Sequence, residues 1–358
     1  MQFIFAPFWG SLSDKIGRRP IVLLSVLISA VGYFLFAFAA LFNVHIVWLF
    51  LARGISGFGN ANIGAAQAIV ADTTTPENRS KGMGLIGAAF GLGFIFGPAL
   101  GAGLSQIHPV VPLLTAGGLA IINFLLAFKL LPETRSQEMA VTERKLIPIH
   151  LIKESTKYVN VSNLILLSLI ITAAFAQMEQ AITLYIDDTF VTGSSYNTER
   201  IKEAAKLTGY FLIVIGVTAT IIQGGLIKSL TRKFGEVRLI QFGIFVMGTS
   251  LFMIPLAGHF GKFWVLMLIA PYMATGSGLV NPSKSSLLSQ SIPQEKQGAI
   301  LGLNQSASSL GRVIGPLLAA ELYTLRPDYP FFIGGTMILF MFTVGYRLKP
   351  QVERKQTK

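Results

Sequence analysis

Between two apolar segments of this chain lies the stretch Gly10-Ser-Leu-Ser-Asp14-Lys-Ile-Gly17-Arg18-Arg19-Pro20. One acid, three cations, two glycines and a proline fall within its eleven residues, a density that no other stretch with apolar flanks reaches. Charged side chains are costly in hydrocarbon, so such a cluster marks a place where the chain leaves the membrane. We therefore predict a cytoplasmic loop between two membrane helices at this stretch.

The composition of the whole chain is that of a membrane protein. Of its 358 residues 52% are hydrophobic and 13% are charged, with a mean hydropathy of +0.61. Soluble domains carry about twice that charged fraction. The net charge of +12 fits the excess of cations in cytoplasmic membrane loops. Nucleic-acid binding would require a basic face on a soluble fold, which the sequence does not indicate, so we expect no nucleic-acid partner.

Three classes of chemistry find no support in the sequence. The chain has no cysteine, which excludes disulfides, thiolate metal sites and cysteine nucleophiles. Its four histidines form no metal-binding motif, and no phosphate-binding P-loop is present. We expect no metal site, no cofactor and no enzyme activity.

Ten apolar segments approach or exceed the ~20 residues that a membrane-spanning helix needs. They are Ile21–Phe42, Ile46–Val70, Gly84–Leu104, Val110–Leu131, Leu164–Ile186, Leu207–Leu226, Leu239–Ala257, Phe263–Leu288, Ala299–Leu322 and Phe331–Tyr346. An eleventh, Met1–Leu12, is apolar but covers only about half of the ~30 Å hydrocarbon core. The sequence predicts an all-α polytopic protein with about eleven membrane segments.

The distribution of cations predicts the orientation. With the loop at Asp14–Arg19 on the cytoplasmic side and alternating helices, 22 of the 29 lysines and arginines lie inside and 5 outside. The remaining two, Arg53 and Arg312, lie within helices. The positive-inside rule therefore favours a multi-pass protein of the inner (plasma) membrane with a cytoplasmic C-terminus.

The two halves of the chain repeat each other. Pro76–Gly82 matches Pro293–Gly298, Gly97-Pro98 matches Gly315-Pro316, and Gly17 matches Gly235, at offsets of 216 to 218 residues. A parallel six-helix repeat is the architecture of two-lobed secondary transporters. We expect an N-terminal lobe at 1–131, a cytoplasmic linker at 132–160, a C-terminal lobe at 161–348 and a cytoplasmic tail at 349–358. The first lobe then begins with the remnant of its second helix, so that a misassigned start and a real truncation are both open.

Three motifs carry a family resemblance. The stretch Gly10–Pro20 resembles the loop between the second and third helices of the major facilitator superfamily. Leu49–Ala61, which contains Arg53, resembles its fourth-helix motif, and Gly93-Phe-Ile-Phe-Gly97-Pro98-Ala-Leu-Gly101 resembles the fifth-helix motif of its antiporters. The resemblance implies the two-lobed major facilitator fold, and it is closest to the twelve-helix drug/proton antiporters that include tetracycline exporters.

The loop residues are the candidates for gating: Gly10, Asp14, Gly17, Arg18 and Arg19. A carboxylate at the end of one helix can pair with a guanidinium or with a helix N-terminus and so favour one of two lobe arrangements. In the superfamily the loop is interpreted in this way. The alternative is that its cations only fix the topology.

Two charged residues within apolar spans are the candidates for proton coupling. Arg53 is expensive in a membrane unless paired, and the resemblance implies a role in coupling with an acid on the first helix. Glu179 is the only carboxylate well inside an apolar span, and we expect it to carry a proton or to bind a cationic substrate. The alternatives are snorkelling or carbonyl contacts for Arg53 and a structural hydrogen bond for Glu179.

Further candidates lie on other spans. Gly93, Gly97, Pro98 and Gly101 are expected to give a bent, closely packed helix that seals an exchanger against leak, or ordinary packing. The candidate substrate-cavity residues are Gln177, Gln180, Asn281, Asn304 and Arg312. Arg312 is expected to pair with an acid such as Glu179 or to contact backbone, and Lys284 is expected to reach the cytoplasmic interface.

These features predict a secondary active transporter that exports amphipathic or cationic small molecules by proton-coupled alternating access. Its partners are then a small-molecule substrate, protons and the lipid bilayer, and we expect a monomer. Uptake or exchange of a metabolite on the same fold is an alternative, because a fold does not fix a function. A truncated fragment without transport activity is another.

Overall fold

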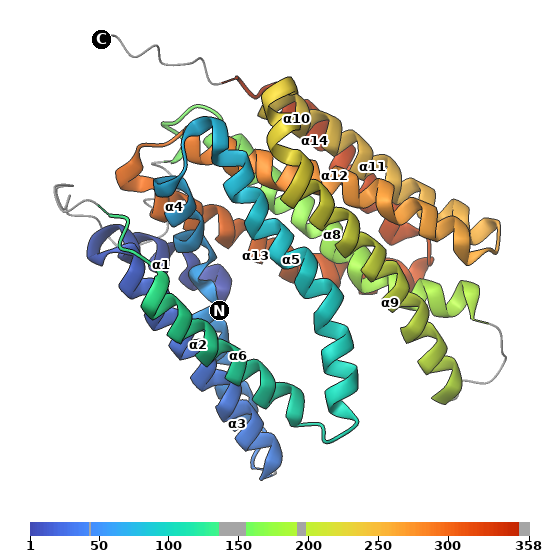
Figure 1. Cartoon of the computed structure of the whole chain (residues 1–358). Helices are drawn as coiled ribbons and strands as arrows, with labels where there is room; N and C mark the ends of the chain where they lie inside the picture. Colours follow the sequence, from blue (N-terminus) through green and yellow to red (C-terminus); the bar gives the residue numbers. More distant parts are fainter. Residues whose placement is uncertain (43, 136–154, 192–197, 351–358) are drawn as a thin grey trace. The chain divides into compact units, whose positions relative to one another are not determined.

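A computed structural model of the chain describes residues 1–42, 44–135, 155–191 and 198–350. Within these residues every regular element is helical and none is a strand, which confirms the all-α prediction. Residues 136–154 of the predicted linker and 351–358 of the predicted tail lie outside the described part. The helices are α1 (Gln2–Ile16), α2 (Arg18–Leu41), α3 (Val47–Gly59), η1 (Asn60–Asn62), α4 (Ile63–Thr73), α5 (Pro76–Ser105), α6 (Val111–Leu130), α8 (Val161–Phe190), α9 (Thr198–Thr220), η2 (Ile221–Leu226), α10 (Ile227–Phe234), α11 (Glu236–His259), α12 (Phe263–Gln290), η3 (Gln294–Lys296), α13 (Gln297–Leu325) and α14 (Tyr329–Tyr346), in chain order (Figure 1).

All ten predicted spans are helical, and eight described helices are long and apolar enough to cross a membrane. The span predicted at Ile46–Val70 differs from the prediction because a 3₁₀ turn, η1, divides it into α3 and α4. At this turn Asn62 Nδ2 donates to Ser25 Oγ at 2.6 Å, and Asn60 Nδ2 donates to Tyr33 Oη at 3.3 Å. These bonds to α2 fix the broken turn in place.

Contacts within the chain define two compact units. Unit 1 consists of Met1–Thr74, Phe96–Lys157 and Ile292–Ala307, and unit 2 consists of Thr75–Ile95, Tyr158–Ser291 and Ser308–Lys358. The division follows the two halves of the sequence except at two helices. The first part of α5 belongs to unit 2, and the first part of α13 belongs to unit 1. The lobe boundaries at 131 and 161 stay a prediction.

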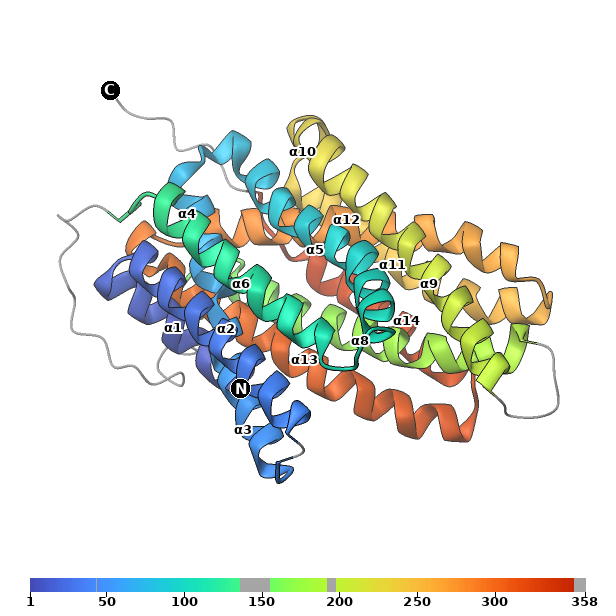
Figure 2. The same cartoon turned by 60° about the horizontal axis from the view of Figure 1, so that its bottom comes forward.

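In unit 1, α2 packs against α3 and α6, which lie beside it in both views (Figures 1 and 2). The core of this unit forms around Trp9, which is 2% exposed and donates its Nε1–H to the carbonyl of Phe58 at 2.8 Å. The rings of Phe5 and Phe58 meet edge to face at 4.7 Å. Burial of these large rings holds the short helix α1 against α3 and η1.

In unit 2, α11 packs against α12 and α14, and α8 packs against α14 and α9 (Figure 1). Between α9 and α10 the backbone forms the π-helical segment η2, whose Ile222 joins Ile227, Leu239 and Leu279 in a buried cluster. A π turn inserts one residue into the helical repeat and so turns the following side chains to another face.

Glycines on α5 allow this helix to approach η2 within unit 2. A Cβ atom added to Gly84 would overlap the carbonyl oxygen of Gln223, and one added to Gly91 would lie 2.7 Å from Thr220 Oγ1. The backbones are therefore closer than any larger residue would permit.

We predict that Gly84→Ala destabilises the protein by about 1–3 kcal/mol, because the obstacle to the new methyl group is backbone and cannot rotate away. The matched control is Gly118→Ala in α6, where nothing lies within 4 Å of the added Cβ. There alanine is expected to leave stability unchanged or to raise it by up to ~1 kcal/mol through helix propensity. Thermal unfolding midpoints of the purified variants measure both effects. Equal midpoints for the two variants would contradict the close approach.

Candidate functional site

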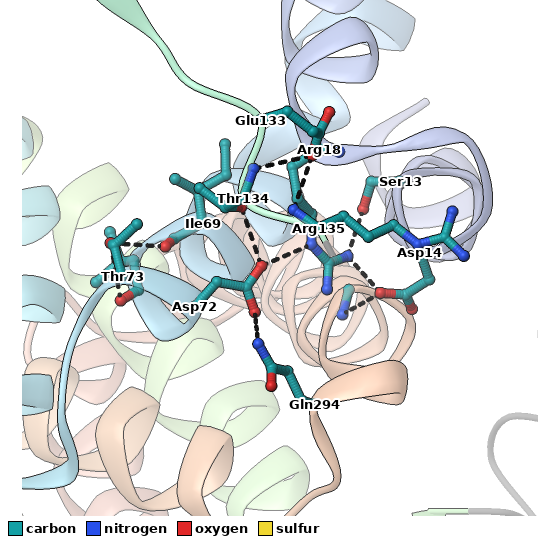
Figure 3. Close-up of polar contacts among 12 residues, drawn as sticks. Ser13, Asp14, Arg18, Ile69, Asp72, Thr73, Glu133, Thr134, Arg135 and Gln294 are labelled. Carbon is teal, nitrogen blue, oxygen red and sulfur yellow. Dashed lines mark hydrogen bonds and ion pairs between the residues drawn. The ribbon is translucent and has the colours of Figure 1, made fainter. Parts of the chain in front are cut away.

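Asp14, at the end of α1, binds the start of α13 within unit 1. Its carboxylate accepts the backbone N–H of Gly298 at 3.0 Å and that of Ala299 at 2.7 Å, and it forms an ion pair with Arg18 (Figure 3). The first N–H groups of a helix lack intrahelical acceptors and form its positive end, so a carboxylate there satisfies both hydrogen bonding and charge. Gly10 makes this approach possible, because a Cβ added to it would overlap the carbonyl oxygen of Gly298.

Arg18 lies between two buried carboxylates. Its side chain is 3% exposed, it pairs with Asp14, and its Nε donates to Asp72 Oδ2 at 3.1 Å. Asp72, at the end of α4, also accepts from Thr134 Oγ1 at 3.1 Å and from Gln294 Nε2 at 3.2 Å (Figure 3). We call these five residues the Arg18 cluster. It joins α1, α2, α4, the residues after α6 and the residues before α13 in one buried polar network.

Burial is the strongest influence on the Asp14 carboxyl and raises its pKa. The Arg18 guanidinium and the two N–H groups of α13 act in the opposite direction. The charge of Asp14 therefore depends on these partners.

Glu133 caps the N-terminus of α2 from the residues that follow α6. Its Oε1 accepts the N–H of Arg18 at 2.9 Å, and its Oε2 accepts the N–H of Arg19 at 3.1 Å. The N–H groups of Thr134 and Arg135 also donate to Oε1, each at 3.0 Å. Burial raises the pKa of Glu133, but these four donors outweigh it and leave the pKa below its ordinary value.

The remaining loop residues lie around this cap. Gly17 has a φ of 121°, which side-chain-bearing residues rarely adopt, and a Cβ there would lie 2.5 Å from Glu133 Oε2. Arg19 donates to the carbonyl of Phe128 at 2.6 Å and stacks over its ring at 5.5 Å. The structure thus brings all five predicted gating residues together in unit 1.

Unit 2 contains a second polar network at the start of α11. Glu236 Oε1 accepts from Ser80 Oγ at 3.3 Å, from Ser286 Oγ at 3.1 Å and from Gln290 Nε2 at 3.0 Å. These residues form the Glu236 cluster, which ties the first turns of α5 to α11 and to the end of α12. Beside it, Arg79 donates to Ser289 Oγ at 2.6 Å.

The two clusters occupy corresponding positions of the repeat. Glu236 lies 218 residues after Arg18, and Gln290 lies 218 residues after Asp72. The polarity is exchanged, because a carboxylate stands where unit 1 has a guanidinium, and a neutral amide stands where unit 1 has a carboxylate. Asp14 corresponds to Arg232, which is exposed on α10.

Charged residues predicted within spans have different surroundings. Arg53 is exposed on α3 with its guanidinium 5.9 Å from the ring centre of Phe36, and it forms no ion pair with a described residue. On α8 and α13, Glu179 and Arg312 interact electrostatically, although no ion pair within 4.0 Å joins them among the described residues. Arg312 also donates to Ser309 Oγ at 3.1 Å.

Lys284 was expected to reach the cytoplasmic interface, and this expectation is wrong. Its residue is 5% exposed within α12 and interacts electrostatically with Arg312. The expectation failed because it counted residues from the helix end, whereas the end of α12 is itself covered by neighbouring helices in unit 2.

The other candidate cavity residues do not form one group. Gln177 is fully buried and donates to the carbonyl of Pro330 at 2.7 Å, so it joins α8 to α14. Gln180 and Asn281 are exposed in unit 2. Asn304 is 3% exposed and belongs to unit 1.

The predicted fifth-helix motif lies in α5. Nothing lies within 4 Å of a Cβ added to Gly93, Gly97 or Gly101, so these glycines make no close helix contact in this structure. The side chain of Pro98 lies outside the described part. The close contact of α5 is made instead by Gly84, Gly87 and Gly91, nearer its start.

Comparison with known proteins decides the family. A family model described as Major Facilitator Superfamily matches residues 1–316. The chain belongs to the Major Facilitator Superfamily. It is 32% identical to the class E tetracycline resistance protein of Escherichia coli, over 90% of this chain and 76% of that protein. It is 27% identical to multidrug resistance protein 1 of Bacillus subtilis (strain 168), over 92% of this chain and 80% of that protein.

A solved structure of the same superfamily has a similar fold. The crystal structure of the human organic anion transporter MFSD10 (TETRAN) superposes with a TM-score of 0.80 at 27% identity, covering 96% of this chain and 80% of that one. The resemblance drawn from the motifs is confirmed. As a member of this superfamily the chain is an integral membrane transporter and not an enzyme.

Sequence reasoning missed Asp72, Glu133 and Glu236 as members of the polar networks of this transporter. Asp72 and Glu133 each follow an apolar span, where a charge is expected in any membrane protein. Glu236 could have been found, because the repeat that pairs Gly17 with Gly235 also pairs Arg18 with Glu236.

We predict that Arg18→Gln destabilises the protein by about 3–5 kcal/mol, because it leaves two buried carboxylates without their cation. The control is Arg19→Gln, which removes a stacked and less buried guanidinium and should cost less than about 1 kcal/mol. Thermal unfolding in the same detergent compares the two. Similar losses in both variants would show that Arg18 is not the central cation.

Glu133→Gln should lower stability in a pH-dependent way. A carboxyl whose pKa is lowered on folding contributes stability above its unfolded pKa, and this contribution is lost as the pH falls through its folded pKa. The variant should therefore be less stable than the parent by roughly 0.3–1 kcal/mol at pH 7, the usual size for a charge at a helix end. The difference should disappear as the pH falls below the ordinary glutamate value of 4.5. Glu321→Gln, an exposed residue on α13, serves as the control for general pH effects, and a difference that persists at low pH would contradict the charged cap.

Proposed function

We propose that this transporter exports amphipathic small molecules by alternating access coupled to protons. The observation that carries the proposal is Glu179, an exposed carboxylate near the middle of α8 that interacts electrostatically with Arg312. Charged residues inside membrane spans nearly always face the bundle interior or a water-filled cavity. A carboxyl group there can take up and release protons during the transport cycle.

Export is supported by the relatives. Tetracycline and multidrug resistance proteins are similar to this chain over most of its length. Resistance requires outward movement of the drug, so the same direction is proposed here. The orientation with a cytoplasmic C-terminus, the plasma membrane as location and the monomeric state are part of the proposal.

The Arg18 cluster supports a gating role. It holds the start of α13 to α1 through two hydrogen bonds to Asp14, and a change of access would require these bonds to break and re-form. A buried, charge-assisted contact that can be broken as one unit gives two discrete states rather than a gradual movement. Arg53 is proposed to act in coupling, and the glycines of α5 to allow helix movement.

Two other readings remain as outcomes of the experiment. A transporter that takes up or exchanges a metabolite would move its substrate inward or only against a second solute. A chain without transport activity would move none of the probes in either direction.

We predict that Glu179→Gln uncouples transport from protons. In proteoliposomes with an imposed pH gradient, the parent should accumulate tetracycline or ethidium and release protons in proportion, while the variant should lose proton movement at least about tenfold. Exchange of labelled for unlabelled substrate, which needs no net proton transfer, should persist in the variant. Glu199→Gln, an 81% exposed residue that pairs with Lys202, is the control and should keep full coupling.

Unchanged coupling in Glu179→Gln would overturn the assignment of the proton carrier. Substrate movement without proton movement in the parent would overturn proton coupling itself.

A further inference from the structure

Lys284 is a buried cation that the gating and coupling roles leave unexplained. It lies roughly 9 Å, about one and a half turns, before the end of α12. Its residue is 5% exposed, its neighbours Ser283 and Ser285 are also buried, and no ion pair joins it to a described acid. Removing an ammonium group from water without an anionic partner is costly, so such a residue is retained where something else supplies the negative charge.

Arg312 extends the positive charge from Lys284 toward the middle of the span. It interacts electrostatically with Lys284 on α12 and with Glu179 on α8. Its position is fixed by close helix contacts on either side: a Cβ added to Gly311 would lie 2.7 Å from the carbonyl oxygen of Leu169, and one added to Gly315 would lie 2.9 Å from the amide nitrogen of Gln177. Arg312 therefore lies along the turns of α8 that lead to Glu179.

The three charges follow one another along unit 2. Lys284 lies near the end of α12 that joins the Glu236 cluster, while Arg312 and Glu179 lie near the middle of α13 and α8. The order is two positive groups followed by one negative group. This arrangement has a positive end and a negative end inside a low-dielectric region, where a mismatch of charge is expensive.

We propose that Lys284, Arg312 and Glu179 together bind a zwitterionic amphipathic substrate, with its acid group at the two cations and its cationic group at Glu179. The inference rests on the proposed transport function and specifies its substrate class. A purely cationic ligand would satisfy Glu179 but would be repelled by Lys284 and Arg312. A purely anionic ligand would satisfy these cations but would meet the carboxylate. A molecule with both charges satisfies all three groups.

The charge order also gives the sign of coupling. The cationic group of the substrate and a proton compete for the same carboxylate, Glu179, so that binding of one favours release of the other. Arg312 from α13, with Gln177 and Gln180 from α8 itself, are the polar groups around this carboxylate. Competition of this kind is what an antiporter requires.

A matched pair of fluorescent probes tests the proposal. Rhodamine B carries a carboxylate and a delocalised cation, and its ethyl ester carries the cation alone. Binding is measured by fluorescence polarisation with the full chain in nanodiscs, empty nanodiscs serve as the blank, and no gradient is needed. The parent should bind rhodamine B at least about tenfold more tightly than the ester.

The variants separate the two ends of the site. Lys284→Gln should weaken rhodamine B at least about tenfold and leave the ester unchanged or tighter, while Lys284→Arg should keep the preference. Glu179→Gln should weaken both probes. Lys233→Gln, which removes an exposed cation of α10, is the control and should change neither. Lys284→Met repeats the test with an apolar residue of similar length, and unfolding midpoints confirm that each variant is folded.

Equal binding of the two probes by the parent, or a preference for rhodamine B that persists in both Lys284→Gln and Lys284→Met, would overturn the proposal. Proton-coupled transport of the ester would then leave the proposed function standing. Selective binding that depends on Lys284 without transport of either probe would have the opposite meaning, since the site would be supported and the transport function would fail.

Discussion

The guanidinium of Arg18, held between two buried carboxylates, is the interaction on which the organisation of unit 1 depends. Asp14 comes from α1 and Asp72 from α4, while Arg18 itself opens α2. Two acids and one cation would leave a buried negative charge, and the N–H groups at the start of α13 supply the compensating positive end. The cluster is therefore complete only when the first turn of α13 is in place, which explains why residues from the second half of the sequence belong to unit 1.

The corresponding place in unit 2 reaches a similar end with different chemistry. Glu236 is surrounded by neutral donors, two serine hydroxyls and the amide of Gln290, and one of these donors comes from the start of α5. Hydrogen bonds from neutral donors to a carboxylate are individually weaker than an ion pair in a buried setting. The two networks thus anchor corresponding helices in each unit, one through compensating charges and the other through hydroxyl and amide groups.

The ten helices could be predicted from apolar length, because each buries or exposes to lipid about 20 residues without interruption. The break at Asn60–Asn62 could not, because it depends on hydrogen bonds to Ser25 and Tyr33 on another helix. The loop residues could be selected from their charge density, but not their partners. Asp72 and Glu133 lie 54 and 115 residues from Arg18, and nothing local distinguishes them from ordinary helix-end charges. Lys284 shows the same limit, since burial at a helix end depends on what packs around it.

The distribution of satisfied and unsatisfied charge separates the helix ends from the middle of the spans. At the ends, the carboxylates of Asp14, Asp72 and Glu236 have close partners, and each partner set joins several helices. In the interior of unit 2, Glu179, Arg312 and Lys284 interact at longer range, and no ion pair joins them among the described residues. Groups that stabilise a fold gain from close pairing, whereas groups that bind and release a ligand must remain able to exchange partners. The close networks thus account for the packing of each unit, and the loosely paired interior charges are the groups that a transported molecule or a proton can engage.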